Sequence, residues 1–260
     1  MRSTQISAAE EREFERKHVW SLRERYLRTD VLKRVETDPG YRQKILLIER
    51  ALRGTTGRVL DLGANTCGEA EVLSTRGYSI VALDVNDLAL GISRERVAVF
   101  RGVGPTYVAG DALRLPLRNE SVAFVISFEI LHHLESPETA LREANRVLAP
   151  NGRMLLFEPY AFDPYRRLSE LRDRLRGSIE TSFGTNETIR LLNRAGFAVE
   201  YLSREVLRPS EWKMQGLSSS RRILRDLHYR VERSVPWLFA SVFVVAFKRG
   251  DMDSVNSHIM

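Results

Sequence analysis

Residues 58–68 read Arg-Val-Leu-Asp-Leu-Gly-Ala-Asn-Thr-Cys-Gly, a short apolar run followed by a turn that contains glycine. The apolar run is typical of a buried strand in a parallel sheet. Gly63 and Asn65 are residue types that readily take a left-handed backbone, and Gly68 begins a stretch with helical spacing of apolar residues. The order of strand, turn and helix predicts a ligand pocket at the carboxyl end of the first strand of a doubly wound sheet.

The turn differs in one position from the fingerprint of dinucleotide-binding proteins. Where that fingerprint has the second glycine, which lets the backbone approach a pyrophosphate, this chain has Asn65. Asp61 adds a carboxylate just before the turn, which repels phosphate and attracts an ammonium group. We therefore expect a nucleoside with a cationic tail and no phosphate, such as S-adenosylmethionine, in preference to a nicotinamide dinucleotide. An ordinary turn between strand and helix is the alternative for this segment alone.

Two further acidic residues follow apolar segments along the chain. Asp84 ends the apolar run 79–84, at the distance from the first strand where a carboxylate that accepts from ribose hydroxyls is expected. Asp111 follows a third apolar segment, where it can accept from an adenine amino group. Each acid by itself is commonly a helix cap or a turn residue. Three acids at successive strand ends favour a nucleoside site.

Together these segments resemble the class I S-adenosylmethionine-dependent methyltransferases, in particular the group of the ubiquinone and menaquinone C-methyltransferases. The resemblance covers about residues 57–160. The chain departs from the family at Asn65 and Cys67, where glycine is usual, and at Ala123, where Asp is usual. The matching segments are Val59–Gly68, Ile80–Asn86, Gly110–Leu117, Phe128–Leu134 and Arg146–Arg153.

The resemblance implies an α/β fold with a Rossmann-like, doubly wound sheet of seven strands, mostly parallel with an antiparallel last strand. The alternation of expected strands and helices after residue 58 agrees with such a sheet. The implied cofactor is S-adenosyl-L-methionine, and the product S-adenosyl-L-homocysteine. The cofactor-binding candidates are Asp61, Gly63, Asn65, Asp84, Val85, Asp111, Ala112 and Phe128.

We divide the chain into an N-terminal helical extension (residues 1–57), a methyltransferase domain (58–250) and a polar tail (251–260). The extension is expected to hold one long helix, Ala8–Glu36, and a second helix, Tyr41–Arg53. Two insertions, 160–183 and 203–236, exceed the minimal repeat, and we expect helices at Pro164–Arg176 and Leu217–Arg233. Because loops at the carboxyl ends of parallel strands usually carry specificity, we interpret both insertions as a cap over the acceptor. Added surface helices without a role are the alternative.

Three residues after the fourth and fifth strands are candidates for catalysis: His132, His133 and Glu158. Methyl transfer from a sulfonium is a direct displacement, so an enzyme mainly positions the two reactants and excludes water. An acceptor with an acidic proton also needs a base, and histidine titrates in the right range. Packing under the following helix is the other interpretation of the two histidines. The sequence contains no cluster with metal-ligand spacing, so no metal is expected.

The chain has 260 residues, 43% of them hydrophobic, a single cysteine and a formal net charge of +6. One cysteine excludes an intrachain disulfide, and no apolar stretch is long enough to span a bilayer, which favours a cytoplasmic protein. Residues 59–157 carry nine basic and twelve acidic groups, or −3, so the excess of positive charge lies in the flanks. These flanks indicate an anionic acceptor, a nucleic acid or simply a solvated surface.

We therefore expect a methyltransferase that acts on a small or medium-sized acceptor through O-, N- or C-methylation. A methyltransferase of RNA is a second hypothesis, although the motif used on exocyclic base amines and any RNA-binding module are missing from the sequence. A regulatory subunit that binds the cofactor without catalysis is a third. The sequence does not determine the acceptor or the oligomeric state.

Overall fold

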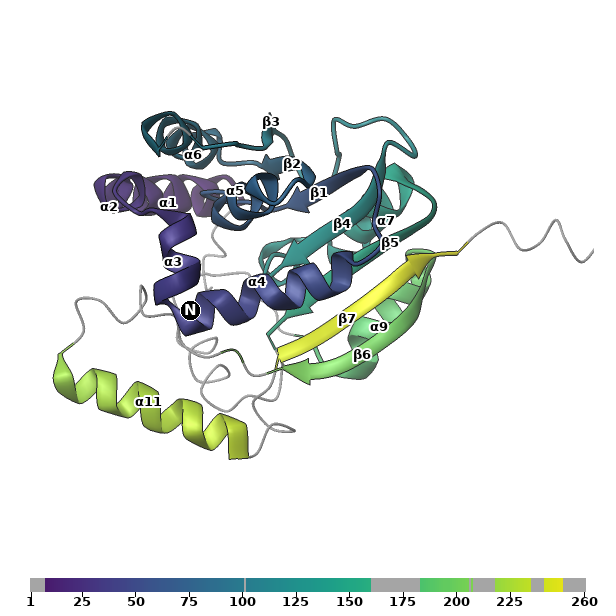
Figure 1. Ribbon diagram of the computed structural model, residues 1–260. Coiled ribbons are helices and arrows are strands. Elements are labelled where there is room, and N and C mark those ends of the chain that lie inside the picture. The colour runs from purple at the N-terminus through teal and green to yellow at the C-terminus, as the bar shows by residue number, and fades with distance from the viewer. Residues whose placement is uncertain are drawn as a thin grey trace, which may run out of the picture.

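The computed structural model describes residues 8–100, 102–159, 183–205, 207, 218–234 and 241–249. Seven strands form one sheet in the order β3-β2-β1-β4-β5-β7-β6 (Figure 1). Every neighbouring pair from β3 to β5 is parallel, whereas β7 runs antiparallel to both β5 and β6. This is the expected fold class. The strands are β1 (Arg58–Leu62), β2 (Ser79–Asp84), β3 (Thr106–Ala109), β4 (Val122–Phe128), β5 (Leu148–Glu158), β6 (Phe197–Glu205) and β7 (Ser241–Lys248).

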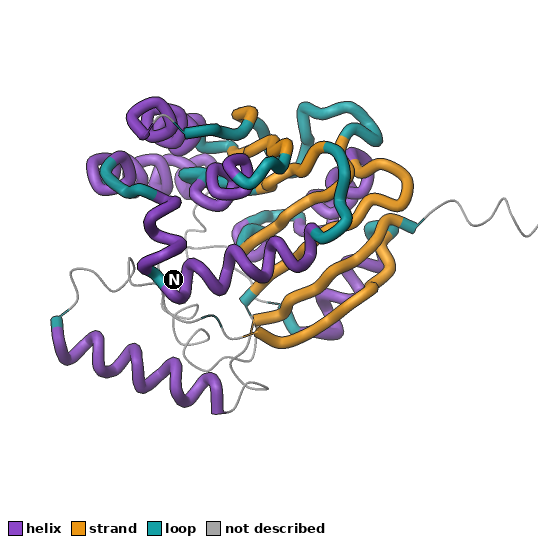
Figure 2. The backbone as a smooth tube through the Cα atoms, in the orientation of Figure 1, coloured by secondary structure: helices purple, strands orange, loops and turns teal. Residues whose placement is uncertain are grey.

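Helices cover both faces of the sheet, as the tube in Figure 2 shows. One face packs against α4 (Pro39–Leu52), α5 (Gly68–Thr75) and α6 (Asp87–Phe100), which contribute Ile48, Leu73 and Leu90 to the core. The other face packs against two further helices, α7 (Pro137–Val147) and α9 (Thr185–Arg194). Both sets of strand side chains are buried, as expected for a mainly parallel sheet with helices on either side.

The chain order reverses at β1. This strand lies between β2 and β4 and pairs in parallel with both, so the loops after β1 and β4 diverge to opposite faces. A crevice outside the carboxyl ends of the strands at such a reversal is the usual ligand site of an open α/β sheet. The loop after β1 is the glycine-containing turn identified from the sequence.

The expectation of one long helix over Ala8–Glu36 is wrong. The segment forms three helices, α1 (Ala8–Ser21), α2 (Arg23–Leu27) and α3 (Val31–Thr37). The Asp30 carboxylate accepts from the backbone N–H groups of Leu32 and Lys33, both at 3.0 Å, and this cap begins a new helix. Apolar spacing alone did not reveal the cap.

The boundary before α4 also differs in detail. Asp38 caps α4 by accepting from the Tyr41 N–H at 3.1 Å, and Pro39 occupies the first helical position. The Asp-Pro-Gly segment therefore starts a helix as well as ending one. Gly77 and Gly196, which follow α5 and α9, have positive φ values of 89° and 85°, as is common where glycine ends a helix.

Strand β5 begins at Leu148. Its pairing with β4 shifts in register between Leu148 and Arg153, and Asn151 takes a left-handed backbone between the two parts. Strand β7 begins at Ser241. Helix α11 (Ser219–Ser234) confirms the helix expected at Leu217–Arg233 to within two residues at its start. The helix expected at Pro164–Arg176 lies outside the described residues.

Among the described residues, no helix is long and apolar enough to cross a membrane.

In Figure 1 the helices α1 to α3 and α11 lie toward the side of the sheet where β7 begins. Because β7 is antiparallel to β5, the parallel strands end on that side. The division of the chain into extension, domain and tail, and the role of the two insertions as a cap, stay predictions.

Candidate functional site

The loop after β1 turns sharply at Gly63, whose φ is 76°. The N–H groups of Gly63 and Ala64 both donate to the Leu83 carbonyl of β2, at 2.8 and 3.0 Å. A Cβ atom at position 63 would collide with the Ile130 side chain, which belongs to the loop after β4. Glycine is therefore required here both by its backbone conformation and by the close approach of the neighbouring loop.

Asp84, at the end of β2, fixes the far side of this loop. One carboxylate oxygen accepts from the Asn65 N–H at 2.7 Å, and the other accepts from the Asn86 N–H at 2.8 Å. Burial raises the pKa of this carboxyl, and the backbone N–H groups of Asn86, Asn65 and Val85 oppose the shift. The two carboxylate oxygens together have about four lone-pair directions, so the group retains capacity to accept from a ligand hydroxyl.

A cavity of about 210 Å³ opens beside this loop. That volume is smaller than the roughly 300–1,000 Å³ of pockets for whole drug-sized ligands, so the cavity fits one end of a nucleoside ligand. Its polar lining includes three carboxylates and one ammonium group. The lining residues are Lys44, Ile48, Asp61, Gly63, Ala64, Asn65, Glu69, Ile126, Phe128 and Glu129.

The charges of the cavity are strongly coupled. Burial raises the pKa of Asp61 to about 7, and the nearby carboxylates of Glu69 and Asp84 add to the shift, while Lys44 opposes it. Lys44 lies 2.9 Å from Glu69. Burial disfavours the ionised form of Glu69, but the Lys44 ammonium outweighs it and holds the pKa of that carboxyl below its usual value.

Lys44 also lies over the Phe128 ring, with Nζ 3.9 Å from the ring centroid. Phe128 in turn stacks on Phe157, with ring centroids 4.2 Å apart and planes 9° from parallel. A cation over an aromatic face is attracted by the negative potential of that face. The end of β4 therefore presents a surface that favours positive charge, next to the carboxylates of Asp61 and Glu69.

This set of groups fits the expected cofactor. S-adenosylmethionine has a sulfonium, an ammonium and a carboxylate at one end, and the cavity offers carboxylates for the first two and Lys44 for the third. A pyrophosphate would instead meet the carboxylates of Asp61 and Glu69. The charge distribution therefore agrees with the sequence-based argument against a dinucleotide.

The other cofactor candidates follow the neighbouring strands β2 and β3. Val85 directly follows Asp84 and is 47% exposed. Asp111 follows β3, and its Oδ1 accepts from the Leu113 N–H at 2.8 Å, which closes a local turn that also pairs Asp111 with Arg114. Ala112 is buried within that turn. The cavity lining itself includes Asp61, Gly63, Asn65 and Phe128, and does not include Val85, Asp111 or Ala112.

Two of the catalytic candidates, His132 and Glu158, form a buried pair, and the third, His133, is exposed. Glu158, at the end of β5, is fully buried and accepts from the N–H groups of Ile130 and Leu131 at 3.0 and 2.8 Å. Its other oxygen lies 2.7 Å from His132 Nδ1, and His132 is only 4% exposed. His133 is exposed, with its ring centroid 4.0 Å from that of His132. Glu158 thus fixes both the loop after β4 and the orientation of one histidine.

Sequence reasoning missed Lys44, Glu69 and Glu129. Glu69 stands next to Gly68 in the analysed turn, so its position was a usable signal. Lys44 lies on α4, in the part of the chain before the resemblance begins, and only the packing of α4 brings it to the cavity. Within the part of the chain that the structure describes, no three His, Cys, Asp or Glu side chains are grouped so as to hold a metal ion.

Comparison with known proteins finds methyltransferases. Residues 60–156 match the family model described as a methyltransferase domain. A demethylmenaquinone methyltransferase of Clavibacter sepedonicus is 30% identical over 183 residues, which is 70% of this chain and 70% of that protein.

Two solved structures show the same fold. Phosphoethanolamine N-methyltransferase 2 of Haemonchus contortus, in complex with S-adenosyl-L-methionine, superposes with a TM-score of 0.63 at 16% identity, over 80% of this chain and 53% of that chain. Geranyl diphosphate C-methyltransferase of Streptomyces coelicolor A3(2), in complex with S-adenosyl-L-homocysteine, has a TM-score of 0.62 at 15% identity, over 80% and 78% of the two chains.

Proposed function

Because the chain belongs to the class I S-adenosylmethionine-dependent methyltransferases of the ubiquinone and menaquinone type, we propose that it methylates a small-molecule acceptor, with His132 as the proton acceptor. It is a methyltransferase whose cofactor is S-adenosylmethionine. The acceptor and the residue roles below are proposals. The observation that carries them is the juxtaposition of the charged cavity after β1 and the buried His132–Glu158 pair after β4 and β5.

On the cofactor side, we assign Asp61 and Glu69 to the positive groups of the methionine end and Lys44 to its carboxylate. Asp84 is assigned to the ribose hydroxyls, through the lone pairs that the loop N–H groups leave available. Asp111, Ala112 and Val85 are assigned to the adenosine end, because they lie at the ends of β3 and β2, outside the cavity lining. Gly63, Asn65 and Phe128 shape the cavity wall.

On the acceptor side, the cofactor supplies an electrophilic methyl group bound to sulfur. The nucleophilic atom of the acceptor attacks the methyl carbon, the carbon–sulfur bond breaks with its electron pair going to sulfur, and the acceptor loses a proton. Glu158 accepts from His132 Nδ1, so the neutral ring carries its basic lone pair on Nε2. We assign the proton to that nitrogen, and a secondary role in acceptor contact to the exposed His133.

For the acceptor, we propose a compound with an acidic hydroxyl next to a methylatable carbon, as in a demethylated naphthoquinol. Support comes from the relative named as a demethylmenaquinone methyltransferase, which matches 70% of this chain. Such an acceptor is a weak acid, and a histidine that takes its proton increases the electron density at the neighbouring carbon. The two insertions, 160–183 and 203–236, remain our candidates for the cap that selects the acceptor.

The test is a two-part assay on the purified chain. Calorimetric titration measures S-adenosylhomocysteine binding, with NAD as the comparison ligand. Transfer of labelled methyl from S-adenosylmethionine is then measured with a soluble naphthoquinol, with phenolic and amine acceptors, and with RNA. Transfer to the naphthoquinol supports the proposal. Transfer only to RNA, with a steep loss of binding as salt rises, contradicts it in favour of a polyanionic substrate.

A further inference from the structure

Two residues of the cofactor loop hold a backbone conformation that their side chains disfavour. Asn65 and Cys67 have φ values of 47° and 53°, in the left-handed region, and neither is glycine. Asn tolerates this region better than most residues, whereas a cysteine in it is unusual. Cys67 is fully buried and immediately precedes the first residue of α5. The loop can stay in this form only if surrounding groups hold it.

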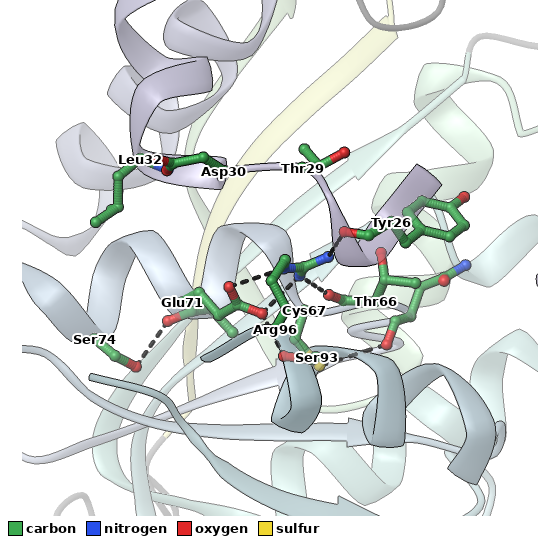
Figure 3. Close-up of polar contacts among 12 residues, drawn as sticks. Tyr26, Thr29, Asp30, Leu32, Thr66, Cys67, Glu71, Ser74, Ser93 and Arg96 are labelled. Atoms are coloured by element: carbon green, nitrogen blue, oxygen red, sulfur yellow. Dashed lines mark hydrogen bonds and ion pairs between the residues drawn. The ribbon is translucent and has the colours of Figure 1, made fainter. Parts of the chain in front are cut away.

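The guanidinium of Arg96, on α6, contacts the loop between these two residues. Arg96 is only 2% exposed, and its Nη2 donates to the carbonyl of Thr66, which lies between the two left-handed residues, at 2.5 Å. Its Nη1 donates to the Tyr26 carbonyl in α2 at 3.2 Å. Figure 3 shows the guanidinium between these two segments, so one side chain ties the cofactor loop to the N-terminal helices.

Glu71 completes the arrangement from α5. Its two carboxylate oxygens accept from Arg96 Nη2 at 2.6 Å and from Arg96 Nε at 3.1 Å, a two-pronged pair that fixes the plane of the guanidinium. Ser93 Oγ also donates to Glu71 (Figure 3). The same hydroxyl lies 3.1 Å from the Tyr107 hydroxyl. A buried ion pair of this kind adds little net stability, but it imposes one geometry on the groups that it contacts.

We propose that Arg96 is a positioning residue for cofactor binding. It keeps the backbones of Asn65 and Cys67 left-handed, a conformation that glycine at these positions would adopt without such support. Asn65 lines the cavity, and its N–H is the group that Asp84 accepts. A loop that relaxes toward the right-handed region at Cys67 moves these groups away from the ligand. The proposal rests on the cofactor pocket of the proposed function and not on the choice of acceptor.

The test separates backbone strain from general stability. Arg96→Lys keeps a positive charge beside Glu71 but lacks the planar donors that reach Thr66 and Tyr26 at once. We expect it to weaken S-adenosylhomocysteine binding about tenfold or more, since a buried charge-assisted hydrogen bond is lost. Adding Cys67→Gly to the Arg96→Lys variant removes the conformational free-energy cost of a left-handed cysteine. It should restore the dissociation constant to within about threefold of the parent.

Cys67→Ala is the matched control, because it removes the thiol as glycine does but retains the Cβ atom that disfavours the left-handed backbone. It should leave the Arg96→Lys defect unrepaired. Arg153→Lys controls for the exchange of arginine for lysine. Arg153, on β5, also donates to a backbone carbonyl, that of Arg53. It pairs with Phe124 near the start of β4, at the opposite end of the strands from the cavity, so its replacement should leave cofactor binding unchanged.

If Arg96→Lys does not fold, the double variant Arg96→Gln/Glu71→Gln replaces it, because it leaves no unpaired buried charge. Its binding defect should likewise be repaired by Cys67→Gly and not by Cys67→Ala. Equal repair by both changes, or an unrepaired loss, overturns the proposal, as does tight binding by a folded Arg96→Lys chain. Failure of the parent to bind S-adenosylhomocysteine would instead count against the proposed function, so the two ideas fail in different ways.

Discussion

The proposed cofactor side and the proposed acceptor side of the site are built differently. On the cofactor side, the loops after β1 and β2 are exposed in part and are held by hydrogen bonds from one strand end to the next, such as Asp84 to Asn65. On the acceptor side, a fully buried carboxylate, Glu158, accepts from two backbone N–H groups and contacts His132. A substitution at Asp84 on the cofactor side removes hydrogen bonds to loop N–H groups only, whereas a substitution at Glu158 affects three contacts at once, including that with His132. The cofactor side should therefore govern affinity and the acceptor side turnover.

The largest effect is expected at Glu158→Gln. The amide oxygen can still accept from the Ile130 and Leu131 N–H groups, but the amide nitrogen donates to His132 Nδ1 and forces the proton to Nε2. A base with its lone pair turned away should lower kcat by roughly a hundred- to ten-thousandfold. Steady-state methyl transfer measures this loss, while the S-adenosylhomocysteine dissociation constant should stay within about threefold of the parent.

His132→Ala is the companion of that variant. If the pair acts in proton transfer, the double variant with Glu158→Gln should be about as slow as either single variant, because the two residues act as one unit. Parent-like turnover in a folded Glu158→Gln chain would show that the pair only supports the loop, and the separation between affinity and turnover would then fail.

Next in size is Asp84→Ala, which acts on the cofactor side. The change removes a charged acceptor from two loop N–H groups and from the ribose hydroxyls that we assign to it, so affinity for S-adenosylhomocysteine should fall about ten- to a hundredfold. Calorimetry measures the change, and circular dichroism verifies folding. Asp87→Ala is the matched control. Asp87 lies three residues after Asp84, is exposed and pairs with Arg16. Equal losses in both variants would exclude a specific role for Asp84.

The pH dependence of cofactor binding should be set by Asp61. Its pKa of about 7 lies above the usual 3.8 because of burial and neighbouring carboxylates, and a positive ligand favours its ionised form. Affinity for S-adenosylhomocysteine, through its ammonium group, should therefore rise about tenfold from pH 6 to pH 8. Asp61→Asn should bind more weakly and with no such rise. A parent profile that is flat over this range would contradict the assignment of Asp61 to the cation.

The raised pKa of Asp61 also predicts how the stability of the ligand-free protein changes with pH. A carboxyl whose pKa is raised on folding contributes stability that is fully present below its unfolded pKa, near 3.8, and is lost as pH rises through about 7. The melting temperature of the ligand-free parent should therefore fall between pH 6 and pH 8 relative to that of Asp61→Asn. Differential scanning calorimetry measures both chains side by side.

The smallest effect is expected at Asp111→Ala. Asp111 closes its own turn by accepting from the Leu113 N–H at 2.8 Å, and the ligand partner that we assign to it is a neutral amino group. A neutral hydrogen bond contributes less than a charged one, so affinity should fall only about three- to tenfold. Asp111→Asn retains an acceptor for the turn and should lose less. A loss at Asp111 that exceeds the loss at Asp84 would reverse our ranking of the two acids.

The sequence determined much of the fold and part of the site. Gly63, the left-handed Asn65 and the acids at the ends of β1 and β2 were predicted because each depends on a local pattern: an apolar run, then a residue that suits a turn. Those patterns occur within a few residues, so no knowledge of distant contacts was needed. The broken N-terminal helix was missed because the Asp30 cap competed successfully with a weak apolar spacing.

Tertiary structure alone decided the remaining parts of the site. Lys44 reaches the cavity because α4 packs on the sheet, and Arg96 reaches the cofactor loop across 30 residues of sequence. The left-handed Cys67 follows from those contacts, since cysteine by itself does not favour that backbone. Sequence patterns report short-range preferences. The geometry of Lys44, Arg96 and Glu158 is set by ion pairs and hydrogen bonds between segments that only folding brings together.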